Sequence, residues 1–309
     1  MKERIASSER NPAIELWRCF CMLAIVFSHV LFFNDLSRGY WLYWHVPGFL
    51  IISGFFGLRA SLSKVIKLLL TVYLCYWLTI PVHGDVGVNL IFPHGGWFVP
   101  FYVVLMIMSP ILNAAIKDRT QHREILVSVV VMLFFAWVPL WVPRLSMMKV
   151  SGLQGRGMLL MMATYLLSRL SAEYGVARKL KGRTWGLLFV GMIIVLWLVY
   201  GNMPATSGYV APPSIFTAFC GFAFFSNLEL PARLSRVICF ISPSMFSVYV
   251  LHNLCVGSWQ CSQFAKESVM HGFLWSVGLF AVCLLIDMIR RLIFYAVEKF
   301  ILRKTVARF

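Results

Sequence analysis

The sequence has 309 residues, of which 60% are hydrophobic and only 13% charged, and its formal net charge is +16 at pH 7. Soluble globular proteins average about 45–50% apolar and 25% charged residues. The composition therefore excludes an ordinary soluble domain and indicates a helical membrane protein.

Long apolar stretches recur along the chain, separated by short breaks that contain Gly, Pro, Asn or charged residues. A helix needs about 20 mainly apolar residues to cross a bilayer. The sequence thus predicts an all-α integral membrane protein, a polytopic bundle of about ten transmembrane helices that forms one domain over residues 1–309. The predicted spans are about 14–33, 41–58, 65–82, 97–116, 125–143, 157–170, 185–201, 213–228, 241–259 and 273–296.

Lysine and arginine are distributed unevenly between the alternate loops of this arrangement. Of the 28 such residues, 22 fall on the side of the two termini and five on the other, with Arg18 inside the first span. Cytoplasmic loops carry an excess of basic residues, so both termini are predicted to be cytoplasmic. We interpret the basic excess as an orientation signal and a contact surface for anionic lipids, with no nucleic acid as partner.

The first span carries Glu15 and Arg18 near one end and His29 near the other. Ionisable residues at membrane depth are costly and indicate function. A histidine there can act as a general base; the alternative is a histidine that only packs against a neighbouring helix. Arg18 suits binding of phosphate or carboxylate; alternatively it extends to the head groups and pairs with Glu15. No group that would orient His29 can be assigned.

Later spans place further polar or aromatic side chains where they would face the bundle interior, since lipid does not tolerate polar groups. We expect these residues to line a substrate pocket: His45 and Ser53 in the second span, Trp97 at the start of the fourth, and Tyr249 and His252 in the ninth. Trp97 also fits an aromatic belt at the interface. The histidines raise the alternative of a metal site, but no paired carboxylate or HxxxH spacing supports one, so no metal is predicted.

Basic residues follow the second span. Lys64 and Lys67 are one helical turn apart and share a face, and Arg59 precedes them. This arrangement suits a polyanionic ligand; the alternative is a positively charged anchor on the cytoplasmic side.

Four motifs occur in the order that is typical of the membrane acyltransferase 3 family. RCFCMLAIVFSH (18–29), preceded by Ile14-Glu15, resembles the first-helix pattern of Arg, ten residues and His. The other three are HVPGFLIISGFF (45–56), GGWFVPFY (95–102) and SPSMFSVYVLH (242–252), which are similar to second-helix, fourth-helix and late motifs. The resemblance implies transfer of an acyl group, often acetyl from acetyl-coenzyme A, to hydroxyls of extracytoplasmic glycans. It also implies a catalytic role for His29 and an essential role for Arg18.

The sequence departs from the family pattern in one motif. Many members carry Arg-x-x-Arg after the second span, whereas this chain has Lys64-x-x-Lys67. Lysine side chains still bind phosphates, but through a single ammonium charge and not through the two parallel N–H bonds of a guanidinium group. Some members carry an appended hydrolase-like domain, which is not found here, so the resemblance implies the stand-alone form.

These features together predict a reaction path across the membrane. Lys64 and Lys67 would hold the phosphates of coenzyme A on the cytoplasmic side, with Arg59 or Arg18 completing the site. Arg18 and His29 are roughly 16 Å apart along a helix, comparable to the reach of a pantetheine arm. His29 would deprotonate the acceptor hydroxyl; an acyl-histidine intermediate is the covalent variant.

The expected location is the bacterial plasma (inner) membrane, and the expected acceptor is capsule, O-antigen, exopolysaccharide or a lipid-linked saccharide. Two other functions stay open at this point. A transporter or flippase for a lipid-linked sugar would explain the polar interior, although the sequence shows no inverted repeat. A non-catalytic partner of a polysaccharide export complex would leave His29 with a structural role only.

Overall fold

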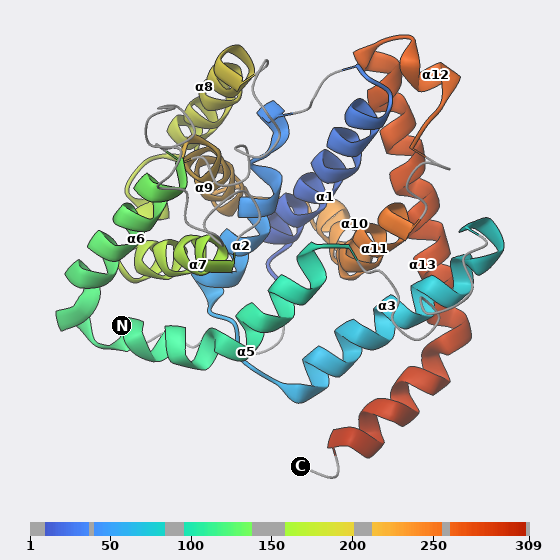
Figure 1. Cartoon of the computed structure of the whole chain (residues 1–309), viewed down its shortest axis with the longest axis horizontal. Coiled ribbons are helices and arrows are strands. Elements are labelled where there is room, and N and C mark those ends of the chain that lie inside the picture. Colours follow the sequence, from blue (N-terminus) through green and yellow to red (C-terminus); the bar gives the residue numbers. More distant parts are fainter. Residues whose placement is uncertain are drawn as a thin grey trace.

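The computed structural model describes residues 10–36, 40–83, 96–137, 158–200, 212–254 and 260–306. Regular structure in these ranges is helical throughout, which confirms the predicted all-α class (Figure 1). The helices are α1 (Pro12–Phe33), η1 (Tyr40–Leu42), α2 (His45–Phe56), α3 (Leu62–His83), α5 (Phe98–Lys117), η2 (Arg119–Gln121), α6 (His122–Trp137), α7 (Met158–Glu173), η5 (Val176–Arg178), α8 (Gly182–Tyr200), α9 (Pro212–Ser226), α10 (Ala232–Ile241), η7 (Ser242–Ser244), α11 (Met245–Leu254), α12 (Gln263–Lys266) and α13 (Val269–Val306). Parts of four predicted spans, at 138–143, 157, 201 and 255–259, lie outside the described residues.

Five of these segments are long and apolar enough to cross a membrane. They are Pro12–Phe33, Leu62–Ile80, Phe98–Lys117, Ala232–Leu254 and Val269–Ala296. Three shorter apolar helices accompany them: His45–Phe56, Gly182–Leu198 and Pro212–Ser226. The fold is therefore that of a multi-pass helical membrane protein, while the count of ten spans and the cytoplasmic termini stay predictions.

The first predicted span is the central helix of the bundle. The side chain of Asn11 caps α1 by accepting from the backbone N–H groups of Ala13 and Ile14 at 3.0 and 3.4 Å, and Pro12 occupies the first turn. The helix packs against α2, α9, α10, α11 and α13, as Figure 1 shows around its blue ribbon. Most of α1 is therefore covered by other helices of the protein.

The second predicted span is broken in the structure. The turn η1 precedes α2, which has only 12 residues, or about 18 Å. Neighbouring helices α1, α7 and α9 cover α2. A Cβ on Gly54 would lie 2.5 Å from the carbonyl oxygen of Tyr165 in α7, so glycine permits this close approach. Irregular backbone at membrane depth is tolerated where protein buries it.

The last two predicted spans have different ends in the structure. The ninth belongs to a continuous stretch that begins at Ala232, in which Pro243 occupies η7 because proline has no N–H to donate to an α-helical turn. The tenth lies within α13, which continues to Val306. Hydropathy locates only the apolar part of a helix, which explains why the amphipathic α10 and the basic end of α13 were not predicted.

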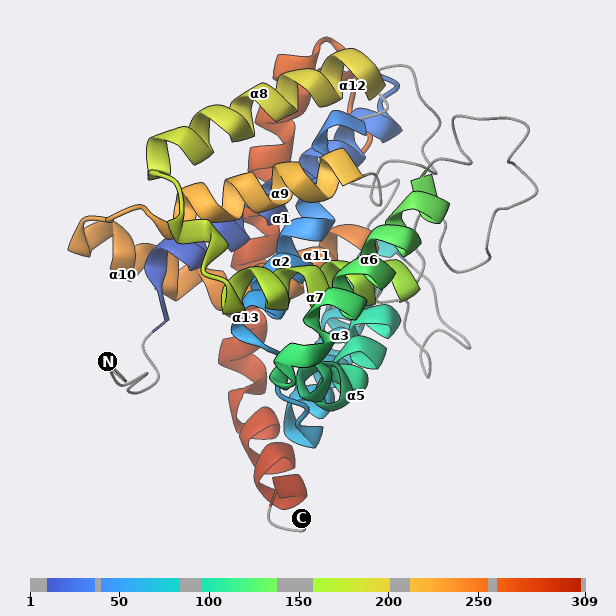
Figure 2. The same ribbon diagram turned by 90° about the vertical axis from the view of Figure 1, so that its left-hand side faces the viewer.

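Aromatic side chains fix α1 against α2, α8 and α9. Trp17 stacks on Trp44 with ring centroids 5.4 Å apart, and Phe20 stacks on the same ring at 5.5 Å. Phe189 of α8 and Phe225 of α9 contact Trp17 at 5.6 and 5.1 Å. Figure 2 shows α8 and α9 side by side over this part of the bundle. This packing holds the half of α1 that precedes His29 in place.

Candidate active site

His29 of α1 contacts His252 of α11. The Nδ1 atom of His29 lies 2.9 Å from Nε2 of His252, and the two rings stack with centroids 5.1 Å apart. His252 is fully buried. The two residues are 223 positions apart, so no local spacing in the sequence could have indicated that His252 orients His29.

Hydrogen-bond geometry determines which ring nitrogens carry protons. Nδ1 of His252 lies 2.8 Å from the carbonyl oxygen of Val248, which only accepts, so this nitrogen is protonated. With both rings neutral, Nε2 of His252 accepts and Nδ1 of His29 donates. The lone pair of His29 then resides on Nε2. A histidine held in one tautomer by its other nitrogen has the form that a general base requires.

Asn34 and Gln260 support this pair from the end of α1. The amide of Asn34 donates to the carbonyl oxygen of Gln260 at 2.6 Å, and its side-chain oxygen accepts from the backbone N–H of Ser262 at 3.1 Å. Gln260 in turn donates to the carbonyl oxygen of His252 at 3.0 Å. These bonds tie the end of α1 to the end of α11, a role that sequence reasoning did not assign to Asn34.

A cavity of about 300 Å³ runs beside α1 on the side of His29. Arg18, Met22 and Ile25 line it. These residues and His29 recur at intervals of four, three and four, which places all four on one face of the helix. His29 thus follows the cavity by one turn. Most other lining residues are apolar, with Ser53, Tyr102 and Tyr249 as the polar exceptions.

Arg18 is the one charged residue among the described residues that line this cavity. Its Nη1 lies 2.9 and 2.8 Å from the two carboxylate oxygens of Glu15, which is buried. The pairing suggested by the sequence is therefore present. At the same time Arg18 remains at the cavity wall, with 30% of its side chain exposed. The ion pair directs a guanidinium group toward a space that is otherwise apolar.

Tyr249 closes the cavity near the histidine pair. Its hydroxyl oxygen accepts from the backbone N–H of Phe98 at 3.2 Å, and its ring contacts His252 with centroids 5.7 Å apart. Gly96 has φ +80°, and a Cβ there would lie 2.6 Å from the same hydroxyl oxygen. Glycine therefore suits position 96 both for its positive φ and for the close approach of Tyr249.

Ser53 lines the cavity from α2. Its hydroxyl donates to the carbonyl oxygen of Phe49 at 2.9 Å and therefore accepts from the hydroxyl of Tyr102 at 3.1 Å. Tyr102 was not among the sequence candidates, although it lies within the fourth-helix motif. The bond joins α2 to α5 across the cavity.

Lys64 and Lys67 line a second cavity, of about 470 Å³, between α3, α11 and α13. Arg290 and Arg291 of α13 line it too, and their Nε atoms pair with the buried Asp287 at 2.8 and 2.7 Å. Four basic side chains thus surround one space, which suits a polyanion. The two arginines were not predicted because nothing in the sequence places α13 beside α3.

The two cavities share the side chains of Leu68 and Phe246 in their walls. The basic cavity and the apolar cavity beside α1 are therefore neighbours. A ligand with a polyanionic head group and a narrow uncharged chain would fit the two cavities, with the head group in the basic cavity and the chain in the apolar one.

Three predicted site residues lie elsewhere. His45 is fully buried and bonds Ser28, the residue before His29, at 3.2 Å. Trp97 packs edge-to-face on Phe98 and Phe101, and it lines neither cavity. Arg59 is exposed on the link between α2 and α3, outside both cavities.

Comparison with known families decides the class of protein. A family model described as an acyltransferase domain, of the acyltransferase 3 type, matches residues 11–288. The chain belongs to the membrane acyltransferase 3 family. No curated protein and no solved structure gives a significant match to it.

Membership of the membrane acyltransferase 3 family confirms the resemblance that the four motifs carry, since the matched range includes all of them. A membrane acyltransferase needs a site for the donor, a base for the acceptor hydroxyl and a path between them. In this chain the basic cavity adjoins the apolar cavity, and the histidine pair follows the apolar cavity along α1.

Proposed function

We propose that this protein is a membrane O-acyltransferase that transfers an acyl group from cytoplasmic acyl-coenzyme A to a hydroxyl of an extracytoplasmic or lipid-linked glycan. Acetyl-coenzyme A is the proposed donor, and capsule, O-antigen or exopolysaccharide is the proposed acceptor. The observation that carries the proposal is the 2.9 Å bond between His29 and His252. His29 lies at the end of the face of α1 that begins with Arg18.

The donor would enter through the basic cavity. Lys64, Lys67, Arg290 and Arg291 would meet the coenzyme A phosphates, on the side that the loop charges predict to be cytoplasmic. The pantetheine arm would pass between Leu68 and Phe246 into the cavity beside α1. Arg18 would meet a carbonyl or amide oxygen of the arm, since a guanidinium donates several hydrogen bonds.

The chemical step follows from the tautomer of His29. Its Nε2 would take the proton of the acceptor hydroxyl, whose oxygen forms a bond to the thioester carbonyl carbon. As the tetrahedral intermediate collapses, the C–S bond breaks, and His29 returns the proton to the sulfur of coenzyme A. The new imidazolium would be stabilised by its bond to His252, and no metal ion takes part. The proposed location is the bacterial plasma membrane.

The proposal is tested by incubating inverted membrane vesicles that contain the protein with acetyl-coenzyme A labelled in the acetyl group. Label should appear on saccharide, be released by mild base as an ester is, and be absent from vesicles without the protein. Saccharide movement across the membrane with no covalent label would contradict the proposal and favour a transporter.

Removing the basic side chains of the donor cavity should weaken donor binding without changing the chemical step. For Lys64→Gln with Lys67→Gln we expect KM for acetyl-coenzyme A to rise roughly 3- to 30-fold with kcat unchanged, because two exposed phosphate contacts are lost. An acetyl-coenzyme A analogue that lacks the 3′-phosphate distinguishes the loss of a charge contact from a folding defect in the variant. If the lysines contact that phosphate, its removal should raise KM for the wild type more than for the variant.

Arg233→Gln with Arg236→Gln is the matched control. Both arginines are exposed on α10 and do not line the cavity, so the same loss of charge should leave KM unchanged. A KM that is equal in the wild type and the lysine variant, or raised equally by the control, would show that Lys64 and Lys67 do not bind the donor.

A further inference from the structure

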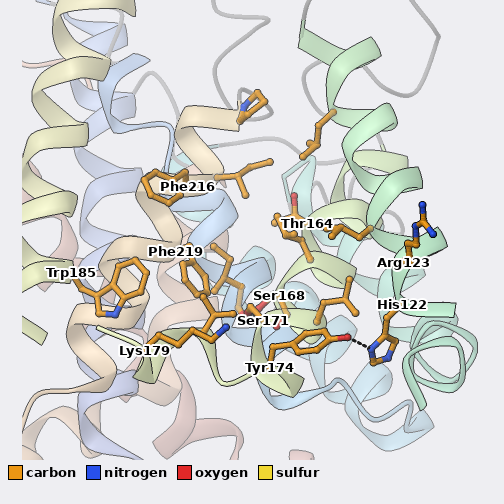
Figure 3. Close-up of a pocket in the computed structure, with 18 residues that line it drawn as sticks. His122, Arg123, Thr164, Ser168, Ser171, Tyr174, Lys179, Trp185, Phe216 and Phe219 are labelled. Carbon is orange, nitrogen blue, oxygen red and sulfur yellow. Dashed lines mark hydrogen bonds between the residues drawn. The ribbon is translucent and has the colours of Figure 1, made fainter. Parts of the chain in front are cut away.

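A larger cavity, of about 640 Å³, lies away from the histidine pair, between α6, α7, α8 and α9 (Figure 3). Ligand sites commonly have volumes of about 300–1,000 Å³. Residues of α6 form one wall and Phe216 and Phe219 of α9 form another, with α7 between them. Leu126 and Phe216 are 45% and 44% exposed, so the groove opens at the surface of the bundle, where lipid would be.

One end of this groove is basic. Arg123 at the start of α6 and Lys179 after η5 line it from opposite walls in Figure 3. Neither forms an ion pair with any residue that the structure describes, and no acidic side chain is among the described lining residues. The nearby Glu173 is already paired with Arg119 at 3.1 Å. Two cations therefore remain to meet an anion.

The same end has a fixed polar wall. Nε2 of His122 lies 2.8 Å from the carbonyl oxygen of Ile116, so this nitrogen donates. With the ring neutral, its Nδ1 accepts from the hydroxyl of Tyr174 at 3.0 Å. This bond joins the start of α6 to the residue that follows α7 and ties the two walls together at the basic end of the groove.

The body of the groove is apolar even where its residues are hydroxylated. On α7, Thr164 donates to the carbonyl oxygen of Leu160 at 2.9 Å, and Ser171 donates to that of Ser168 at 2.7 Å. Ser168 donates to the carbonyl oxygen of Ile51 at 2.7 Å. Because these hydroxyls are satisfied within the protein, the floor requires no polar group from an occupant.

The length of the groove matches one leaflet. Arg123 and Leu133 both line it and are ten residues apart on α6, which is about 15 Å along a helix. Half of the hydrocarbon core of a bilayer is about the same thickness. Its basic end lies on the side that the loop charges predict to be cytoplasmic, where anionic head groups are attracted to basic residues between helices.

We propose that this groove binds an anionic glycerophospholipid, with the phosphate at the end that Arg123 and Lys179 line and an acyl chain along α6, α7 and α9. The site is separate from the histidine pair. Lipid retention, not acyl transfer, is its readout, so the test does not depend on the proposed function.

Native mass spectrometry of the purified protein with phosphatidylglycerol or phosphatidylcholine of identical chains tests this site. The wild type should retain phosphatidylglycerol over phosphatidylcholine, and Arg123→Gln with Lys179→Gln should weaken its retention roughly 10- to 30-fold, since each cation near a head group contributes a several-fold attraction. Lys181→Gln with Arg183→Gln, which removes two exposed cations that do not line the groove, should retain it as the wild type does.

Two further arms test the apolar part. Leu126→Trp narrows the groove and should lower retention of phosphatidylglycerol with Arg123 and Lys179 intact. Glycerol phosphate, which has the anion but no chains, should not compete with the lipid at equal concentration. Equal retention by the Arg123/Lys179 variant and the wild type, an equal loss in the Lys181/Arg183 control, unchanged retention by Leu126→Trp, or full competition by glycerol phosphate would each overturn the proposal.

Discussion

Replacing His29 with glutamine is expected to lower kcat for acyl transfer by about 10²–10⁴-fold, the usual contribution of a general base. The side chain of glutamine has an amide that can still donate to Nε2 of His252, so the packing between α1 and α11 is preserved. What it lacks is a lone pair basic enough to accept the hydroxyl proton. The variant therefore separates the base from the structural role of the ring.

The measurement is the rate of label transfer to saccharide at equal abundance of each protein in the membrane. KM for acetyl-coenzyme A should change little, because the donor cavity and Arg18 are intact. His29→Ala should lose at least as much activity as His29→Gln. Transfer by His29→Gln within tenfold of the wild type would show that His29 is not the base, and would favour the interpretation that it only packs against α11.

Replacing His252 should impair the reaction through His29. His252→Leu removes the acceptor that holds His29 Nδ1–H, so His29 samples both tautomers and its ring is no longer oriented. We expect kcat to fall about 100-fold, which is more than one hydrogen bond is worth and no more than the loss of the base itself. His252→Gln retains a side-chain oxygen that can accept from His29 and should recover part of this loss.

A double-mutant cycle distinguishes this positioning role from a general loss of stability. If His252 acts through His29, then His29→Gln with His252→Leu should be no less active than His29→Gln alone. A residue that only supports the fold would add its own loss to that of His29. Additive losses in the cycle, or no rescue by His252→Gln relative to His252→Leu, would contradict the assigned role.

The class of fold and most helix positions could be predicted from the sequence because hydrophobicity is a local property. The run from Ile14 to Phe33 is apolar enough to form a span, and Asn11 and Pro12 mark its start. The prediction was least accurate where a helix is not uniformly apolar. The amphipathic α10 and the basic end of α13 form helices that hydropathy alone does not detect, and α2 is shorter than its apolar segment.

The site was only partly predictable. The sequence singled out Arg18 and His29, because ionisable residues inside an apolar run are costly wherever the helix is placed. Lys64 and Lys67 were identified by their shared helical face. Arg290 and Arg291 were not, since only the packing of α13 against α3 brings them to the same cavity.

The sequence by itself thus determined the membrane class, the family motifs and the residues of α1 that are costly to bury. Only the tertiary structure decided that His252 bonds His29, that Tyr249 meets the backbone at Phe98, and that a basic cavity adjoins an apolar one at Leu68 and Phe246. The physical reason is the sequence distance over which each effect acts. Burial cost is set residue by residue along the chain, whereas a hydrogen bond across 223 positions depends on how every intervening helix packs.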